Sequence, residues 1–488
     1  MSEQKEIKRG LNRSMTVGEK TKCILWCLAV ALFALWMGSW VPLIAIPFVA
    51  DVYWTRFIPW TWWKDIKNGF LRSVMSWVDA IVFALAAVWI LQNFFVQNFK
   101  IPTTSLEKTM RAGDYLLVSK VNYGPRIPMT PLSLPIFHNT IDILGINLGD
   151  SYLDKPLLEY SRMPGLGKVE RYDIVVFNYP SGDTVASDMP AADYYQLRFQ
   201  YGVEAMHKGR FGKLIYRPVD RRENYVKRCV GLPGDSLQII DNVIHIDGKA
   251  LPTPQYAQQR YFIATRPGKE IAASTWKKLG VYDEDHNDFD AVPNFPKTEL
   301  AMTLGLETDT LTGEFRGKIY SALLTREMKE RLESMTATVQ YVGVQPAEIF
   351  GQDYVYPLSE TNPWTRSDYG PIWIPRKGES IELNAWNAEL YGRCIRNYEG
   401  NTLEETPGGK WLLNGKEASS YTFRMDYYWM MGDNRDNSAD SRYWGFVPED
   451  HIVGTPLFIW FSLDPETGSL LKDRFFKRIK GSDELGNL

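Results

Sequence analysis

Apolar residues are concentrated in two long segments near the N-terminus. The first covers 23–50 and the second covers 74–96, which has about the ~20-residue length needed to cross a bilayer core. One glycine and two prolines interrupt the first segment, which is therefore consistent with one kinked span or with a re-entrant pair of short helices. Neither segment looks like a cleavable signal peptide. We predict a transmembrane helix over 74–99 and leave both forms open for the first segment.

Beyond Ile101 the apolar positions form short β-branched and aromatic runs bounded by Gly, Asp, Asn and Pro, which is typical of β-strands. The two dipeptides Asp247-Gly248 and Asn414-Gly415 each separate two such runs and predict tight hairpins. The pattern predicts a mainly β, antiparallel fold behind a helical membrane anchor. The strand-like runs are DYLLVSKV, YDIVVFNYP, YVKRCVGL, SLQIIDNVIHIDGK, GKWLLNGKEASSYTF and IVGTPLFIWFSL.

Two stretches interrupt the strands and are predicted as insertions, one at about 125–167 and one at about 253–365. The second contains a predicted helix over 320–335, in which apolar residues recur every four positions. The chain thus divides into three predicted regions. They are 1–73 with the tail, the first apolar segment and a basic loop, 74–99 with the transmembrane helix, and 100–470 with the β domain and its insertions.

Basic residues indicate how the second span is oriented. The loop between the apolar segments carries Arg56, Lys64, Lys67 and Arg72, so the positive-inside rule places it in the cytoplasm. The second span then runs outward, and the chain after about Phe99 is extracytoplasmic. The tail before the first segment is also basic, which conflicts with a single first span and favours a re-entrant one.

Composition excludes several classes of function. The net charge of -3 lacks the basic footprint of a nucleic-acid-binding protein. No CxxC pair and no HExxH helix occurs, so we predict neither a metal site nor a cofactor. Cys229 and Cys394 lie far apart, and their spacing leaves open whether they pair.

Ser105 lies just beyond the second apolar segment, in the run IPTTSLEKTM. A serine before LEKTM is well suited to cap a short helix, and from this stretch alone that structural role is favoured. A catalytic role requires a base, because a serine hydroxyl is a weak nucleophile at its usual pKa. The chain has five His but no GxSxG elbow, and His451 is better explained by structure than by catalysis.

Two lysines are the alternative bases. Lys108 forms an S-x-x-K pattern with Ser105, but the KTG and SDN tripeptides that accompany this pattern in penicillin-binding proteins are missing. Lys227 lies in a strand-like run, where alternation places it on the face opposite to Val226 and Arg228. Burial among apolar side chains would lower its pKa towards neutrality. The competing interpretation is an exposed lysine on an edge strand.

A dense polar run follows the glycine at 432 and ends before a new apolar strand. A turn stabilised by Asx hydrogen bonds would explain it. Interleaved opposite charges instead favour a network that holds one side chain in place for catalysis. An EF-hand is excluded by the position of the glycine and by Trp444 at the place of the bidentate ligand. The run contains Asp433, Asn434, Arg435, Asp436, Asn437, Ser438, Asp440, Ser441 and Arg442.

Taken in order, IPTT before a serine, GDYLLVSK, DIVVFNYP, KRCVGLPGD and GDNRDNSADSRYWG resemble the motif boxes of bacterial type I signal peptidase, also called leader peptidase. The resemblance covers about 74–124, 168–251 and 425–460. It implies a membrane-bound serine endopeptidase that removes signal peptides after small residues, typically Ala-x-Ala. The implied fold is a largely antiparallel, barrel-like β structure on a membrane anchor. The implied location is the cytoplasmic (inner) membrane with the active site on the periplasmic side.

The resemblance also implies roles for individual residues. Ser105 would be the nucleophile and Lys227 the general base of a Ser/Lys dyad. Thr103 would stabilise the oxyanion together with the Ser105 N–H, and Ser438 would orient Lys227. The implied supporting network is Asp433, Asn434, Arg435, Asp440 and Arg442, and the implied peptide neighbours are Ile101, Pro102 and Leu106. The family usually has Met where Leu106 stands and often Pro where Lys108 stands.

The implied partners are signal-peptide-bearing preproteins, the lipid bilayer and the protein export machinery, with no nucleic acid. A self-cleaving repressor peptidase of the same superfamily is disfavoured by the membrane segments. A non-catalytic membrane scaffold, which would use the insertions to hold export partners, is disfavoured by the combination of Ser105, Lys227 and Ser438.

Overall fold

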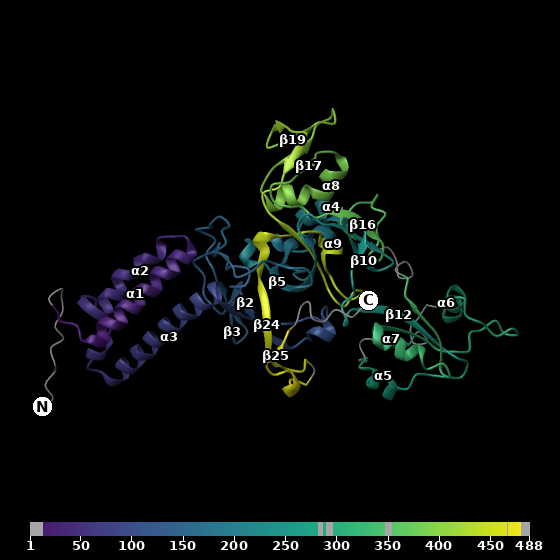
Figure 1. Cartoon of the computed structure of the whole chain (residues 1–488), viewed down its shortest axis with the longest axis horizontal. Helices are drawn as coiled ribbons and strands as arrows, with labels where there is room; N and C mark the ends of the chain where they lie inside the picture. The colour runs from purple at the N-terminus through teal and green to yellow at the C-terminus, as the bar shows by residue number, and fades with distance from the viewer. Residues whose placement is uncertain (1–12, 282–285, 289–295, 347–353, 466, 480–488) are drawn as a thin grey trace. The chain divides into compact units, whose positions relative to one another are not determined.

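The computed structural model describes residues 13–281, 286–288, 296–346, 354–465 and 467–479 (Figure 1). Contacts divide the chain into two compact units. One contains 1–97 and 120–168, and the other contains 98–119 and 169–488.

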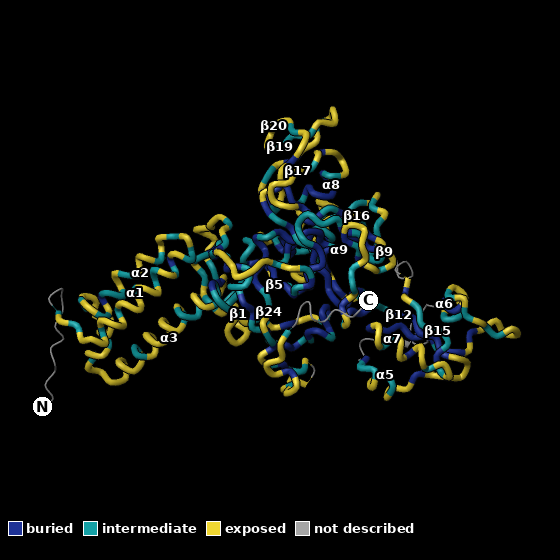
Figure 2. The backbone as a smooth tube through the Cα atoms, viewed as in Figure 1, coloured by how far each residue is buried: buried dark blue, intermediate teal, exposed yellow. Residues whose placement is uncertain are grey.

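Two long helices of the first unit have the length and composition of membrane spans, α1 (Val17–Met37) and α3 (Gly69–Phe94). Thr16 and Glu19 form a capping box at the start of α1, and Asn68 caps α3. Both helices are exposed along most of their length in Figure 2, as expected for helices that face lipid. The predicted 74–99 helix starts at Gly69 instead, and it ends at Phe94 before β1 (Val96–Lys100).

The first apolar segment is one helix followed by a shorter segment that returns along it (Figure 1). The return consists of the 3-10 turn Val41–Ile44, α2 (Ala45–Ala50) and the π turn Asp51–Thr55. Arg13, before α1, donates to the Tyr53 carbonyl at 2.8 Å, and Arg56 pairs with Glu19 at 2.8 Å. The basic tail and the basic loop therefore meet at one end of α1. The first apolar segment therefore has the re-entrant form rather than that of one kinked span.

The second unit is built around an antiparallel sheet with the strand order β1-β2-β24-β5-β8-β22-β23, and β25 also pairs with β24. The long strand β24 pairs with both β2 and β5, and β-bulges in these pairings bend the sheet. Gly454 is required there, because a Cβ atom would lie 2.2 Å from the Ser119 carbonyl oxygen. The strands are β2 (Asp114–Ser119), β5 (Ile174–Asn178), β8 (Asn224–Gly231), β22 (Tyr427–Met431), β23 (Val447–Pro448), β24 (Ile452–Ser462) and β25 (Lys477–Arg478).

A second β region surrounds a large aromatic core that includes Trp429, Tyr369 and Phe446. It contains a sheet with the order β11-β10-β9-β16 and two small ribbons. Its members are β9 (Ser236–Ile240), β10 (Val243–Ile246), β11 (Lys249–Ala250), β16 (Tyr369–Trp373), β17 (Ser380–Glu382), α8 (Ala385–Arg393), β18 (Leu403–Glu405), β19 (Trp411–Leu413), β20 (Lys416–Glu417) and β21 (Ser420–Thr422). Beside it lie β6 (Thr184–Ala186), α4 (Tyr194–His207) and β7 (Leu214–Tyr216).

Both predicted hairpins form, β10–β11 and β19–β20. Each turn has positive φ at both central residues, 50° and 76° at Asp247-Gly248 and 51° and 77° at Asn414-Gly415. These values match a type I′ turn, for which Asp, Asn and Gly are preferred. Cys229 and Cys394 are buried and free, so they do not pair.

The second insertion contains a small sheet with the order β13-β14-β12-β15. Alternate residues of β12 face two cores, with Tyr261 and Ile263 on one side and Phe262 and Ala264 on the other. Its elements are β12 (Gln258–Thr265), α5 (Ala273–Leu279), β13 (His286–Asp288), α6 (Lys297–Thr303), β14 (Ile319–Thr325), α7 (Arg326–Glu333) and β15 (Val339–Val344).

The predicted 320–335 helix is wrong in its first part. Residues up to Thr325 belong to β14, and the Thr325 hydroxyl caps α7, which starts at Arg326. Leu324, counted towards the helical pattern, is a buried strand residue that pairs with Gln259. A spacing of four places residues on one side of both a helix and a strand, so this spacing alone did not separate the two.

Candidate active site

Ser105 lies in the loop between β1 and β2, and local hydrogen bonds hold this loop in shape. The Ile101 N–H donates to the Asp114 carbonyl at 2.9 Å, and the Gly113 N–H donates back to the Ile101 carbonyl at 2.9 Å. The 3-10 turn Glu107–Thr109 follows the serine. The loop is therefore closed at its base, which fixes the direction in which Ser105 points.

Lys227 and Ser105 are in hydrogen-bond contact, with Lys227 Nζ donating to Ser105 Oγ. Lys227 lies on β8, a central strand between β5 and β22, and it is 3% exposed. Ser105 is 7% exposed. The alternative of an exposed lysine on an edge strand is therefore wrong. A hydroxyl next to a buried amine is the arrangement that activates a serine without histidine.

Burial lowers the pKa of Lys227 to about 8, because the low-dielectric interior disfavours its charged form. Asp440 and Asp433 oppose this effect by attracting the ammonium, and Arg442 adds to it by repulsion. Each carboxylate already has an arginine partner, so neither compensates Lys227 fully. The lysine consequently loses its proton at about pH 8 rather than 10.5, which is closer to the range in which a general base works.

Two buried ion pairs organise the polar run after β22. Asp433 accepts two hydrogen bonds from Arg228, each at 2.7 Å, and Asp440 accepts two from Arg442, each at 2.9 Å. Burial raises the pKa of Asp433 and Asp440, but these arginines outweigh it and lower both values. The Asp440 carboxylate also accepts from the Gly432 N–H at 3.1 Å. The run is thus a closed network rather than a solvated turn.

The same network holds the loop that carries Ser105 through the main chain. The Asn434 N–H donates to the Ser105 carbonyl at 3.1 Å, and the Asn434 side chain donates to the Thr104 carbonyl at 3.4 Å. Arg435 is buried, and Arg442 donates to its carbonyl at 2.5 Å. All five predicted supporting residues therefore belong to one connected cluster.

Thr103 and Ser438 differ in how they contact Ser105 and Lys227. Thr103 Oγ1 is 3.4 Å from Ser105 Oγ, on the exposed side of the loop. Ser438 Oγ donates to the Ala439 carbonyl at 3.4 Å and lies against Gly432. No hydrogen bond joins Ser438 to Lys227 among the described residues, so its orienting role stays a prediction.

The three predicted peptide neighbours also differ in exposure. The side chains of Ile101 and Leu106 are buried in the apolar cluster beneath the loop, together with Met110. Pro102 is exposed. In this conformation Pro102 is the member of the set that a peptide can reach, while Ile101 and Leu106 support the loop from below.

Lys108, the other candidate base, is directed towards the second insertion. Its Nζ donates to the Gly280 carbonyl at 2.9 Å, at the end of α5. His451 is buried between Asp450 and Arg222, with contacts of 2.5 Å and 2.7 Å, in agreement with a structural role. Neither side chain is in hydrogen-bond contact with Ser105 among the described residues.

Sequence reasoning did not assign roles to Arg228, Thr109 and Gln258. Thr109 donates to Asp433 at 2.9 Å. Gln258, in the second insertion, donates its N–H to the Asp433 carbonyl at 2.8 Å and accepts from the Arg435 N–H at 2.9 Å. For Arg228, the strand pattern predicted only that its side chain lies on the face opposite to Lys227. It did not predict the ion pair with Asp433.

A glycine at 432 is required by the packing of the site. A Cβ atom there would lie 2.2 Å from Ser438 Oγ and 2.7 Å from the Ser105 carbonyl oxygen. We expect Gly432→Ala to displace the loop that carries Ser105 and to reduce kcat/KM by about 10- to 100-fold, because small misplacements of reacting groups are costly. Gly408→Ala is the control, since its nearest neighbour would be 4.0 Å away. Equal activity of the two variants would contradict this packing.

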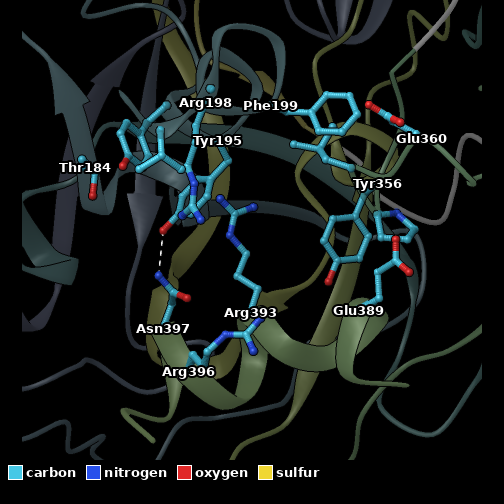
Figure 3. Close-up of a pocket in the computed structure, with 15 residues that line it drawn as sticks. Thr184, Tyr195, Arg198, Phe199, Tyr356, Glu360, Glu389, Arg393, Arg396 and Asn397 are labelled. Atoms are coloured by element: carbon cyan, nitrogen blue, oxygen red, sulfur yellow. Dashed lines mark hydrogen bonds between the residues drawn. The ribbon is translucent and has the colours of Figure 1, made fainter. Parts of the chain in front are cut away.

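A cavity lies apart from this site. It has a volume of about 750 Å³ and lies between α4 and the end of α8 (Figure 3). Arg393 lines it and is engaged structurally, stacked 3.5 Å over the Tyr195 ring and donating to the Trp444 carbonyl at 3.0 Å. A second cavity of about 690 Å³ reaches Arg435 and is lined by Tyr261 and Leu324 of the second insertion. Among the described residues no cluster of His, Cys, Asp or Glu is suited to hold a metal ion.

Comparison with known families agrees with this geometry. The family model described as "Signal peptidase, peptidase S26" matches residues 74–295 and 379–461, which is more than half of the chain. The chain therefore belongs to the signal peptidase family, peptidase S26, and is a serine endopeptidase. This confirms the family expected from the motif order and the mainly β fold.

Two relatives have low sequence identity to this chain but match most of its length, and a third has higher identity over a short stretch. Signal peptidase I of Buchnera aphidicola subsp. Acyrthosiphon pisum is 24% identical over 402 residues, which cover 82% of this chain and 77% of the relative. Signal peptidase I of Haemophilus influenzae is 23% identical over 415 residues, 84% of this chain and 77% of the relative. Signal peptidase I of Helicobacter pylori is 40% identical over 86 residues, 15% of this chain and 30% of the relative.

Proposed function

We propose that this chain is a membrane-bound signal peptidase that cleaves preproteins with a Ser105/Lys227 dyad. The observation that carries the proposal is the contact between Lys227 Nζ and Ser105 Oγ inside a buried network. The partners are signal-peptide-bearing preproteins, the lipid bilayer and the protein export machinery.

The first half of the reaction forms an acyl-enzyme. Neutral Lys227 accepts the Ser105 hydroxyl proton while Oγ attacks the scissile carbonyl carbon. The negative charge that develops on the carbonyl oxygen is stabilised by the Thr103 hydroxyl and the Ser105 N–H. The C–N bond then breaks, and the Lys227 ammonium returns its proton to the leaving amine of the mature protein.

The second half releases the signal peptide. Lys227, neutral again, takes a proton from a water molecule whose oxygen attacks the ester carbonyl. The ester bond breaks, the signal peptide leaves with a new carboxyl terminus, and the Lys227 proton returns to Ser105 Oγ. Ser438 orients Lys227 through both halves.

Membrane anchorage is supported by α1 and α3, whose length and composition suit a bilayer. Arg13 and Arg56 lie together at the N-terminal end of α1. The positive-inside rule assigns this end to the cytoplasm. The active site then works on the extracytoplasmic, periplasmic side of the inner membrane, where cleavage sites of exported proteins emerge.

The cleavage preference that we propose is for Ala-x-Ala sites. The test is cleavage, in detergent, of a peptide with an Ala-x-Ala site and of a peptide with Phe in place of its last Ala. We expect the Phe peptide to lose about 100-fold or more in kcat/KM, since a small pocket rejects a bulky ring. Comparable cleavage of both peptides would contradict the preference. Absence of cleavage of either would favour the scaffold alternative.

A further inference from the structure

The first insertion contains a β-hairpin with one apolar and one polar face. It consists of β3 (Thr140–Ile143) and β4 (Ile146–Asp150), with Ile143 opposite Ile146 and Asp142 opposite Asn147. Paired residues share a face, and residues two apart along a strand do too. From the tip to Ile141 and Leu148 the apolar face therefore carries Ile141, Ile143, Ile146 and Leu148, and the polar face carries Asp142 and Asn147. A register shift follows, beyond which Thr140 pairs with Asp150.

The apolar face is exposed. Ile143 is 47% exposed, and Ile146 and Leu148 are each 62% exposed. An isolated two-stranded hairpin is marginally stable in water, and exposed apolar patches usually mark an interaction surface. The apolar face is therefore a candidate interaction surface.

The turn at the tip of the hairpin has a leucine, Leu144, in a backbone conformation that is unfavourable for this residue. Leu144 and Gly145 have φ values of 53° and 81°, as in a type I′ turn. The two other such turns described above use Asp and Asn at the first position. Here a leucine occupies it and is 98% exposed. A bulky apolar side chain held in the left-handed region points to a function for the side chain itself.

The segment that contains the hairpin is fastened to the outgoing ends of both long helices. The Lys120 N–H, before the segment, donates to the carbonyl of Phe95, which follows α3. The Trp36 indole, in the last turn of α1, donates to the Pro164 carbonyl at 2.9 Å. Both attachment points lie where the two candidate spans end.

We propose that the β3–β4 hairpin lies on the lipid surface, with its apolar face and Leu144 in the boundary between headgroups and acyl chains. Such elements insert about 5–10 Å. The hairpin carries Asp142 and Asp150 and no basic residue, so the contact depends on apolar burial rather than on anionic lipid. The inference rests on the proposed function only for the anchorage of α1 and α3.

The test uses single cysteines labelled with an environment-sensitive nitrobenzoxadiazole dye in phosphatidylcholine nanodiscs. The full chain carries Cys23→Ser and Cys27→Ser, while Cys229 and Cys394 are buried and remain. The probes are Leu144→Cys at the tip and Leu148→Cys on the apolar face. The matched controls are Asn147→Cys on the polar face and Leu311→Cys, which replaces a leucine that is 93% exposed in the second insertion.

We expect dye at Leu144 and Leu148 to emit at shorter wavelength than dye at Leu311, and to be quenched about twofold or more by lipids with a doxyl group near the headgroup. Dye at Asn147 should be quenched less than dye at Leu148. Equal quenching at Leu144 and Leu311 would overturn the proposal. A shift to shorter wavelength without doxyl quenching would also overturn it, because protein rather than lipid would then cover the hairpin.

These readouts are independent of catalysis. A failure of the Ser105/Lys227 assignment would leave the quenching pattern intact, and a failure of the hairpin proposal would leave cleavage of a soluble peptide intact. Unchanged peptide cleavage by each labelled variant shows that the label has not unfolded the chain.

Discussion

Ser105→Ala is expected to abolish cleavage of an Ala-x-Ala peptide, with a loss in kcat/KM of about 10⁴-fold or more. Removing the nucleophile of a hydrolase leaves only the catalysis that binding and the oxyanion site provide. The fold should be retained, because the Ser105 side chain hydrogen-bonds only Lys227 and Thr103 within the described part of the chain, and the loop is held by main-chain bonds. The measurement is kcat/KM on purified full-length protein in detergent, with the midpoint of thermal unfolding as the folding check.

The matched control is Ser462→Ala. Ser462 is fully buried at the end of β24, and its hydroxyl has no hydrogen-bond partner among the described residues. This variant should cleave as the wild type does. Residual activity of Ser105→Ala within about tenfold of the wild type would exclude Ser105 as the nucleophile.

Lys227→Met is expected to lose activity to a similar extent and, at neutral pH, to make the protein more stable. Methionine is of similar length and removes the cost of a buried ammonium. Burial lowers the pKa of Lys227 from its usual 10.5 to about 8, which corresponds to about 3 kcal/mol at ~1.4 kcal/mol per pH unit. Loss of the contact with Ser105 reduces the gain. A variant that is inactive and yet more stable separates a catalytic role from a structural one.

The gain in folding stability of Lys227→Met over the wild type should decrease as pH rises. Below pH 8 the lysine is charged in both the folded and the unfolded chain, so the wild type bears the full cost. Between about pH 8 and 10.5 only the unfolded chain keeps the proton, and wild-type stability rises with pH. The advantage of Lys227→Met should therefore fall below about 1 kcal/mol at about pH 10. Thermal unfolding of both proteins at pH 7 and at pH 10 measures this.

Lys108→Met is the control for this experiment. Lys108 is only partly buried and donates to Gly280, so its replacement should bring no gain at neutral pH. A destabilising effect of Lys227→Met at pH 7 would mean that the charged lysine is stabilised in the folded chain. Its pKa would then be raised rather than lowered, and it would be a poor base.

Sequence pattern predicted the two hairpin turns correctly, because the conformational preferences of their own residues determine them. Asp247-Gly248 and Asn414-Gly415 form their turns because these residues accept positive φ at little cost. The prediction of a helix over 320–335 was wrong in its first part because strand pairing, a tertiary contact, determines the conformation there. Leu324 is drawn into β14 by its pairing with β12, and helical spacing applies only from Arg326 onward.

In the site, alternation along β8 left open whether Lys227 is buried or exposed. The central position of β8 in the sheet decides this, since it leaves no face to solvent. The resemblance supplied the assignment of Ser105, which sequence pattern alone favoured as a cap. The positions of Thr109 and Gln258 beside Asp433 were not predictable, because these residues approach it from distant segments of the chain. The need for a glycine at 432 became visible only with Ser438 and the Ser105 carbonyl in place.

The central claim is that Lys227, and not Lys108, activates Ser105. The most direct test is the pH dependence of kcat/KM for the wild type, Lys227→Ala and Lys108→Ala on one Ala-x-Ala peptide. The acid limb of such a profile reports the pKa of the base in the free enzyme. We predict that the wild type and Lys108→Ala gain activity as pH rises through about 8, while Lys227→Ala stays at background at every pH. An active Lys227→Ala together with an inactive Lys108→Ala would contradict the account.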